Sequence, residues 1–332
     1  MTTRLARRVE DLLGEAAAGD QGALARLLSA VERGGGPMRE VAALSYRTPP
    51  PYTLGLTGAP GAGKSTLTDR LIGTARRGWP AGPDGQPGEP VDRLAVLAVD
   101  PTSPYTGGAI LGDRVRMRSH EDDPGVFIRS MATRGHLGGL ALALPDAVRL
   151  LGAAGVPLVV IETVGVGQME VEVASAADTT VVLVTPGWGD SMQANKAGLL
   201  EVADVFVVNK ADRPGTREAR RDLEQMLDLS HLDEWRPPVL ETVASTGEGV
   251  DELWSAVGAH RSHLTDTGRL SARRAARLEA ELARVVEAAL AARVHGLAGG
   301  EAFAEAARAL AEQRTDPYGA TDRLLADVAG AE

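Results

Sequence analysis

The chain has 332 residues, a formal net charge of −10 at pH 7 and no cysteine. The acidic balance argues against nonspecific binding to nucleic acid or to an anionic membrane surface, because no basic excess exists to neutralise phosphates. The lack of cysteine excludes disulfides, iron–sulfur clusters and thiolate metal sites, and no apolar run approaches the roughly 20 residues that span a bilayer. The basic N-terminus passes at once into Glu10, Asp11 and Glu15, unlike a signal or transit peptide. We therefore expect a cytoplasmic protein.

The N-terminal part of the chain has the spacing of amphipathic helices. Apolar residues recur at helical intervals over residues 3–32, and Gly19-Asp20 interrupts them. This pattern predicts a helical hairpin that ends at the Gly- and Pro-rich residues 34–37. An apolar run at residues 52–57 follows, and we expect it to form the first strand of the core.

A phosphate-binding pattern, G-x-x-x-x-G-K-[ST], directly follows that strand and leads into a predicted helix. Strand, Gly-rich turn and helix are the context in which this pattern binds phosphate, because backbone N–H groups and the helix N-terminus surround the anion. We expect Lys64 to bridge the β- and γ-phosphates and the Ser65 hydroxyl to bind Mg²⁺. The predicted nucleotide-binding residues of this turn are Gly58, Ala59, Pro60, Gly61, Ala62, Gly63, Lys64, Ser65 and Thr66.

A second strand is predicted at residues 94–99, after a Pro- and Gly-rich segment, 78–90, that we interpret as an exposed, mobile loop. Asp100 ends this strand and is a candidate ligand of the metal. Residues 106–113 contain three glycines, which would permit refolding when the γ-phosphate leaves, so they are interpreted as a switch. Asp113 is a weaker metal candidate, since it could equally cap a following helix.

The next predicted strand, at residues 157–161, leads into Glu162-Thr163-Val164-Gly165. This matches the D-x-x-G motif of GTPases with Glu in place of Asp. We expect the Glu162 carboxylate to reach Mg²⁺ through a water and the Gly165 N–H to contact the γ-phosphate. Lys64, Glu162 and Gly165 are thus the predicted catalytic residues.

The residue after this motif is Val166, where Ras-type GTPases carry a Gln that positions the attacking water. The nearest Gln is Gln168. We therefore expect slow intrinsic hydrolysis that needs a partner or a rearrangement to supply a polar group.

Guanine recognition is predicted after the strand at residues 205–208, where Asn209-Lys210-Ala211-Asp212 fits the N-K-x-D pattern. A carboxylate at Asp212 can accept from both N1–H and the exocyclic amine of guanine, whereas adenine lacks this donor pair and would leave the carboxylate unpaired. Ala244, Ser245 and Thr246 follow a short strand at 239–243 and would close over the base. The expected ligands are GTP or GDP with Mg²⁺.

The C-terminal part from about Leu270 again has helical patterns. Apolar residues mark one face of a long helix over residues 278–294, and helices are expected at 301–313 and near Leu324. These fit either a lid packed on the sheet or a dimer-forming arm. With a further strand at 179–184 and helical patterns between most strands, the predicted fold is α/β, a doubly wound, mostly parallel sheet.

These motifs together resemble the MeaB type of G-protein chaperone, the methylmalonyl-CoA mutase-associated GTPases that are also labelled ArgK or LAO transport kinase. The resemblance covers nearly the whole chain, and the strings T-G-G-x-I-L-G-D at 106–113 and E-T-V-G-V-G-Q at 162–168 are specific to the family. One departure is Met169, which stands where Ser is common.

The resemblance implies a homodimeric SIMIBI-class P-loop GTPase that binds an adenosylcobalamin-dependent acyl-CoA mutase, gates its cofactor loading and protects it from inactivation. It also implies that residues 186–196 form a third switch facing the mutase, with Asp190 and Lys196 as its responsive charges. The expected divisions are a helical extension over 1–48, a GTPase domain over 49–265 and a helical dimerisation arm over 266–332.

Two other classes of function fit the sequence less well. A metallochaperone GTPase needs thiolate or clustered imidazole ligands, but the chain has no Cys and six scattered His. The closest His pair, His260 and His263, is predicted to lie on a helix surface. A kinase would need an acceptor pocket with a catalytic base, and no kinase-type catalytic motif is present.

Overall fold

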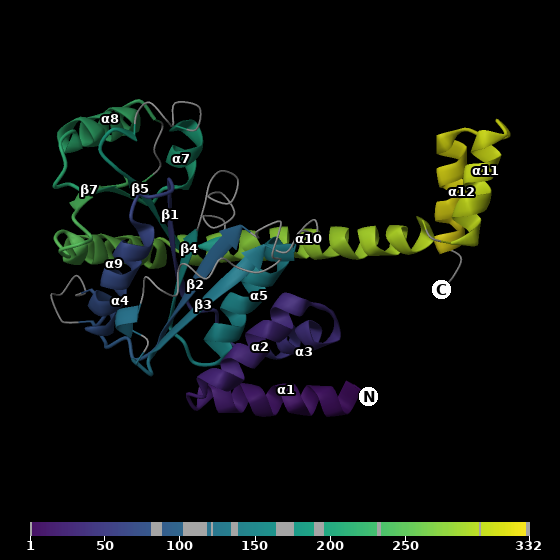
Figure 1. The fold of residues 1–332 in the computed structure, drawn as a ribbon, viewed down its shortest axis with the longest axis horizontal. Helices are drawn as coiled ribbons and strands as arrows, with labels where there is room; N and C mark the ends of the chain where they lie inside the picture. The colour runs from purple at the N-terminus through teal and green to yellow at the C-terminus, as the bar shows by residue number, and fades with distance from the viewer. Residues whose placement is uncertain are drawn as a thin grey trace. The chain divides into compact units, whose positions relative to one another are not determined.

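The computed structural model describes residues 2–80, 88–101, 118–120, 122–133, 139–163, 176–188, 196–230, 234–298 and 300–329 (Figure 1). Its contacts divide the chain into one unit of Met1–Arg277 and a second of Leu278–Glu332. The predicted domain limits at 48 and 265 are not tested by this division and stay a prediction.

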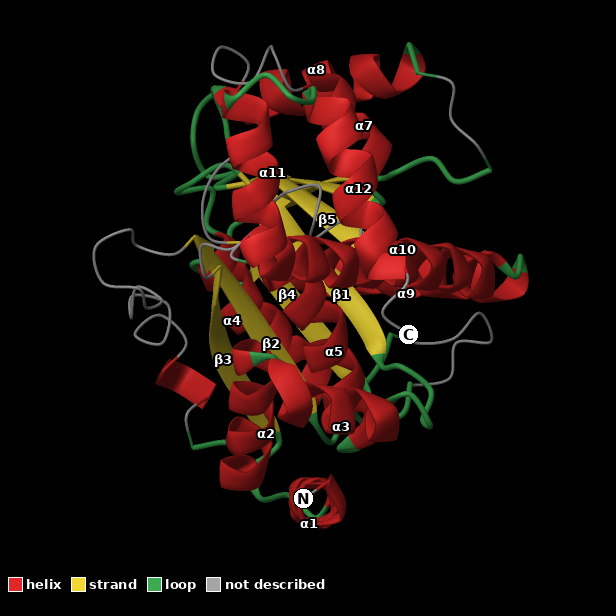
Figure 2. Ribbon diagram, turned by 90° about the vertical axis from the view of Figure 1, so that its right-hand side faces the viewer, coloured by secondary structure: helices red, strands yellow, loops and turns green. Residues whose placement is uncertain are grey.

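The first unit is built on a seven-stranded sheet in the order β3-β2-β4-β1-β5-β6-β7. Figure 2 labels β1 to β5 of this sheet. Every paired neighbour runs parallel. The fold-class prediction is therefore confirmed. The strands are β1 Tyr52–Gly58, β2 Leu94–Pro101, β3 Val126–Thr133, β4 Leu158–Thr163, β5 Thr179–Val184, β6 Val205–Asn209 and β7 Val239–Thr242.

Helices cover both faces of the sheet, because side chains that alternate along each strand point to opposite sides. On β4, Leu158 and Val160 pack with residues of α4 (Lys64–Arg76) and α9 (Val250–Asp266). Val159 and Ile161 pack on the other side, with α5 (Gly139–Ala153). A third cluster joins β5 and β6 to α8 (Thr216–Asp228), and α7 (Lys196–Val202) lies between those two strands in the chain. Figures 1 and 2 show this layered arrangement.

The N-terminal helices belong to the same apolar cluster as α5. The predicted hairpin is present as α1 (Thr2–Ala17) and α2 (Gln21–Arg33), with Asp20 capping α2 through a 2.9 Å bond from the Ala23 N–H. A third helix, α3 (Gly35–Ser45), was not predicted. Its Pro37 lies in the first turn, where the missing N–H has no intrahelical partner in any case.

Two further differences have clear physical reasons. β3 is an edge strand whose Arg129 pairs with Glu32 at 2.7 Å, and this charged side chain interrupts the apolar run that would have revealed it. The loop predicted at 78–90 is wrong at its start, because Trp79 is half-buried and stacks on Trp254 with ring centroids 5.3 Å apart. Residues 81–87 lie outside the described residues.

The C-terminal helices are α10 (Arg269–Ala298), α11 (Glu301–Ala311) and α12 (Pro317–Ala329). They confirm that the chain ends in helices, and α12 is longer than the short helix expected near Leu324. Along α10 the large apolar side chains of residues 282–294 are exposed, with Leu282 at 65%. Among the described residues, no helix is long and apolar enough to cross a membrane.

A polar network closes the amino ends of β5 and β6. Asp178 is 1% exposed and accepts from Arg274 at 2.5 Å and from Arg277, both on α10. Burial raises the pKa of Asp178, but hydrogen bonds and charges of the two arginines outweigh it, so the net shift is downward. Burial raises the pKa of Asp204, which accepts from Arg273.

His260 of α9 lies in this network and not on a helix surface, so that prediction is wrong. It is 0% exposed, with Nδ1 2.7 Å from the Thr179 hydroxyl and Nε2 3.2 Å from an Asp204 oxygen. Burial lowers the pKa of His260 to about 3, and the charges of Arg273 and His263 act in the same direction. The imidazole is therefore neutral in the folded protein at neutral pH.

This burial makes stability depend on pH. Below about pH 6.5 the unfolded chain binds a proton at His260 that the folded protein does not take up until about pH 3. We expect the free energy of unfolding to fall by about 2 kcal/mol on this account between about pH 7 and about pH 5. The variant His260→Asn keeps a polar group near Thr179 but cannot titrate. Urea unfolding of this variant should therefore show a smaller fall in the free energy of unfolding over the same pH range. An equal loss in the variant would contradict the assignment to His260.

Candidate functional site

The predicted nucleotide motifs meet at one edge of the sheet. β1 ends at Gly58, β4 at Thr163, β6 at Asn209 and β7 at Thr242. Because the strands are parallel, the segments that follow them converge at their carboxyl ends, where open α/β sheets bind ligands. β1 lies between β4 and β5, so the turn after Gly58 is central.

The turn after β1 has a conformation that requires glycine at two positions. Gly58 has φ 141°, and a Cβ there would lie 2.2 Å from the carbonyl oxygen of Leu183. Gly63 has φ 96°, and a Cβ there would lie 2.4 Å from the Asn209 amide nitrogen. The backbone can therefore curl tightly before α4 begins at Lys64, whose Nζ donates to the carbonyls of Gly58 at 2.6 Å and Ala59 at 3.2 Å.

Asn209, at the end of β6, and Lys210, directly after it, hold this turn in place. The Asn209 amide nitrogen donates to the Ala62 carbonyl at 2.7 Å, and Lys210 Nζ donates to the Gly61 carbonyl at 2.6 Å. The Asn209 oxygen accepts from the Thr242 hydroxyl at 3.0 Å and from the Ala244 N–H at 3.2 Å. One buried amide thus ties the phosphate turn to the loop after β7.

A cavity of about 190 Å³ opens beside these residues. It is lined by Gly63, Thr66, Asn209, Lys210, Asp212, Arg213, Val243, Ala244 and Ser245. The structure therefore brings Asp212, Ala244 and Ser245, the residues predicted to contact the base, to one cavity. Thr246 does not line the cavity; its hydroxyl donates to the Val243 carbonyl at 3.1 Å and holds the turn. Arg213 and Val243 were not predicted, although both adjoin predicted residues.

Glu162 lies at the phosphate end of this edge and is 1% exposed. Its two carboxylate oxygens accept separately, one from Ser65 Oγ at 2.5 Å and the other from Thr68 Oγ1 at 3.0 Å. Hydroxyl and carboxylate oxygens are the donors that Mg²⁺ prefers, usually one or two per site with waters and phosphates completing the shell. The pair Ser65 and Glu162 fits such a metal. Thr68 was missed, and its place one turn after Ser65 on the same helix is the signal that could have revealed it.

Several predicted residues lie outside the described part of the chain. These are Gly165, Asp113 and Asp190, together with Val166, Gln168, Met169 and the glycines of the segment 106–113. Asp100 is in β2 and Lys196 begins α7, but their side chains are not described. Among the described residues, no group of three or more His, Cys, Asp and Glu side chains could hold a metal ion.

Comparison with known proteins shows which family the chain resembles over most of its length. The family model described as methylmalonyl-CoA mutase-associated GTPase MeaB matches residues 24–298. A putative GTPase of Pyrococcus abyssi is 45% identical over 328 residues, which are 97% of this chain and 97% of that protein. The mitochondrial methylmalonic aciduria type A homolog of Mus musculus is 36% identical over 228 residues, which are 67% of this chain and 52% of that protein. A crystal structure of an LAO/AO transport system kinase has a TM-score of 0.68 at 27% identity, covering 96% of this chain and 97% of that one.

The contact between Thr68 and Glu162 can be tested by measuring how nucleotide release depends on the Mg²⁺ concentration. Replacing Thr68 by Val keeps the side-chain volume but removes the hydroxyl that holds the second carboxylate oxygen. We expect roughly tenfold more Mg²⁺ to be needed to slow the dissociation of labelled GDP, because Glu162 is then less well oriented. Thr74→Val is the matched control, since Thr74 lies on the same helix but donates to Asp251. Equal Mg²⁺ dependence in both variants would contradict this role.

Proposed function

This chain belongs to the methylmalonyl-CoA mutase-associated GTPase family, and from that membership we propose that it binds GTP and GDP and hydrolyses GTP. The observation that carries the proposal is the buried amide of Asn209, which links the Gly-rich turn to the loop beside Asp212. A phosphate site and a base site are thereby held at a fixed separation, as one nucleotide requires.

In this proposal different residues bind the phosphates, the metal ion and the base. Backbone N–H groups of residues 59 and 61–66 and the Lys64 ammonium bind the phosphates, and the start of α4 adds its positive dipole end. Ser65 and Glu162 would hold Mg²⁺, with Asp100 and Asp113 as further candidates, and the bound ion would offset charge on the phosphate oxygens. Gly165 would contact the γ-phosphate.

The base would enter the cavity beside Asp212, with Ala244 and Ser245 on its other side. The Asp212 carboxylate is exposed, so it is available to accept from N1–H and the exocyclic amine of guanine. Hydrolysis then needs a water in line with the γ-phosphate. Because Val166 cannot orient that water, we propose that turnover is slow until a partner supplies a polar group.

Guanine selection can be tested at Asp212. In Asp212→Asn the amide nitrogen would face the guanine amine, donor against donor, whereas xanthine carries a carbonyl there. We expect GDP to bind on the order of a hundredfold more weakly and xanthosine diphosphate to bind more tightly than it binds the wild-type chain. Competition against a labelled nucleotide measures both. Asp222→Asn, exposed on α8, should leave both affinities unchanged. Unaltered GDP binding in Asp212→Asn would contradict the proposed base site.

We further propose that the partner is an adenosylcobalamin-dependent acyl-CoA mutase, whose cofactor loading this chain gates and which it protects from inactivation. Support comes from the description of the family and from the name of the murine relative. We also propose a homodimer. Its support is the exposed apolar face of α10, formed by Leu282, Val285, Val286, Leu290 and Val294 at helical spacing.

The partner is tested by measuring GTP hydrolysis by the full chain, alone and with candidate mutases. We expect a low basal rate that rises with one mutase, which should co-elute with the chain on a sizing column. Light scattering on the same column, without mutase, should give the mass of two chains. A rate unchanged by every mutase, with no complex formed, would leave the GTPase proposal and remove the chaperone role.

A further inference from the structure

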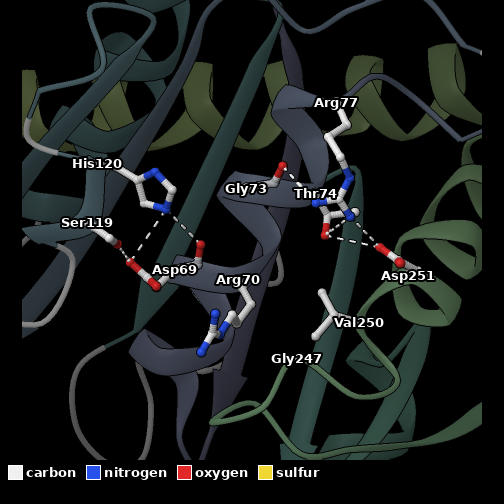
Figure 3. A pocket seen from close by; sticks show the side chains of 10 residues that line it. All are labelled: Asp69, Arg70, Gly73, Thr74, Arg77, Ser119, His120, Gly247, Val250 and Asp251. Carbon is white, nitrogen blue, oxygen red and sulfur yellow. Dashed lines mark hydrogen bonds and ion pairs between the residues drawn. The ribbon is translucent and has the colours of Figure 1, made fainter.

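The loop after β7 that forms one wall of the base cavity is bonded to α4 by an arginine that the sequence motifs do not include. We call residues 243–247 the base loop. Arg70 Nε donates to the Ala244 carbonyl at 3.1 Å, and its terminal nitrogen donates to the Ser245 carbonyl at 2.6 Å. Figure 3 shows Arg70 on α4, between Asp69 and the turn at Gly247.

The backbone of Ala244 is held at both its N–H and its carbonyl. Its N–H donates to the Asn209 oxygen at 3.2 Å, and its carbonyl accepts from Arg70. Asn209 fixes the base loop to β6, while Arg70 fixes it to α4. Hydrogen bonds from a guanidinium are charge-assisted and are stronger than those between neutral groups. Arg70 is therefore a strong constraint on the position of the base loop.

α4 also carries the phosphate end of the site. Lys64 and Ser65 begin the helix, and Thr66 lines the base cavity one turn before Arg70. A bond from this helix to the base loop thus fixes the distance between the residues proposed for the phosphates and those proposed for the base. A bound nucleotide contacts both sets of residues. If the base loop moves away from α4, the contacts to the base weaken while the contacts to the phosphates stay intact.

We propose that Arg70 is a positioning residue that holds the base loop against guanine and thereby sets the guanosine-dependent part of nucleotide affinity. This inference rests on the guanine-nucleotide site proposed above. Arg70 is exposed and also lines a second cavity of about 280 Å³ with Asp69, His120 and Asp251. Because its side chain lies at this open surface, its removal leaves no void in the core.

The test compares two ligands that share the phosphate site. Labelled GDP contacts both ends of the site, whereas inorganic tripolyphosphate contacts the phosphate end alone. In Arg70→Ala we expect GDP to dissociate roughly tenfold faster, as expected for the loss of two hydrogen bonds. Tripolyphosphate should compete as it does in the wild-type chain. Arg70→Lys keeps one donor and should recover part of the loss.

Arg77→Ala is the matched control. Arg77 is on the same helix, lines the same second cavity and pairs with Asp251 at 2.7 Å. Its other hydrogen bonds go to Gly73 and Thr74 on its own helix and not to the base loop. We expect this variant to match wild type with both ligands. GDP dissociation in Arg70→Ala within twofold of the control would overturn the inference. So would a parallel loss of GDP and tripolyphosphate, which would indicate a disturbed phosphate turn.

A failure of the proposed function would give a different result in these experiments. A wild-type chain that binds tripolyphosphate but prefers no guanine nucleotide would overturn the base site itself, and the role of Arg70 with it. A wild-type chain that prefers GDP, combined with unchanged Arg70 variants, would overturn the role of Arg70 alone.

Discussion

The site depends on one buried side-chain amide. Asn209 is 1% exposed, and its nitrogen and oxygen serve different loops: the nitrogen donates to Ala62 and the oxygen accepts from Thr242 and Ala244. The orientation is fixed, since a flipped amide would set its nitrogen against the Ala244 N–H and its oxygen against the Ala62 carbonyl. The same amide explains the glycine at 63, because a Cβ there would meet its nitrogen. A buried amide with every partner in place is worth more as a constraint on geometry than as a source of stability.

The two ends of the sheet are built from different chemistry. At the carboxyl ends of the strands the residues are glycines, hydroxyls and backbone groups around Lys64, which suit a phosphate anion. At the amino ends of β5 and β6, Asp178 and Asp204 are neutralised by arginines of α10. Breaking a buried pair of this kind is strongly destabilising, because one charge would be left uncompensated. Ligand chemistry and structural charge are therefore kept apart by the length of the strands.

The sequence was sufficient where one local pattern decides the structure. Six strands were predicted from runs that are mostly apolar, and the phosphate turn was predicted from its glycines. β3 was missed because Arg129, at the sheet edge, interrupts its run, and α3 was missed because Gly and Pro were interpreted as an end instead of a beginning. His260 was misplaced because burial depends on what packs against α9. Thr68 and Arg70 belong to no motif, since their partners lie far away in the sequence.

These last two residues show why α4 is more than the support of the phosphate turn. Ser65 and Thr68 face Glu162, three residues apart along the helix, and hold both oxygens of a carboxylate that is one methylene longer than the usual Asp. Arg70 reaches the base loop, and the neighbouring Asp69 accepts from Ser119, just after the predicted switch at 106–113. Residues on successive sides of one helix thus contact the metal candidate, the base loop and the segment that follows the switch. A shift of α4 would have to disturb all three together, so these contacts give the helix a single favoured position relative to each.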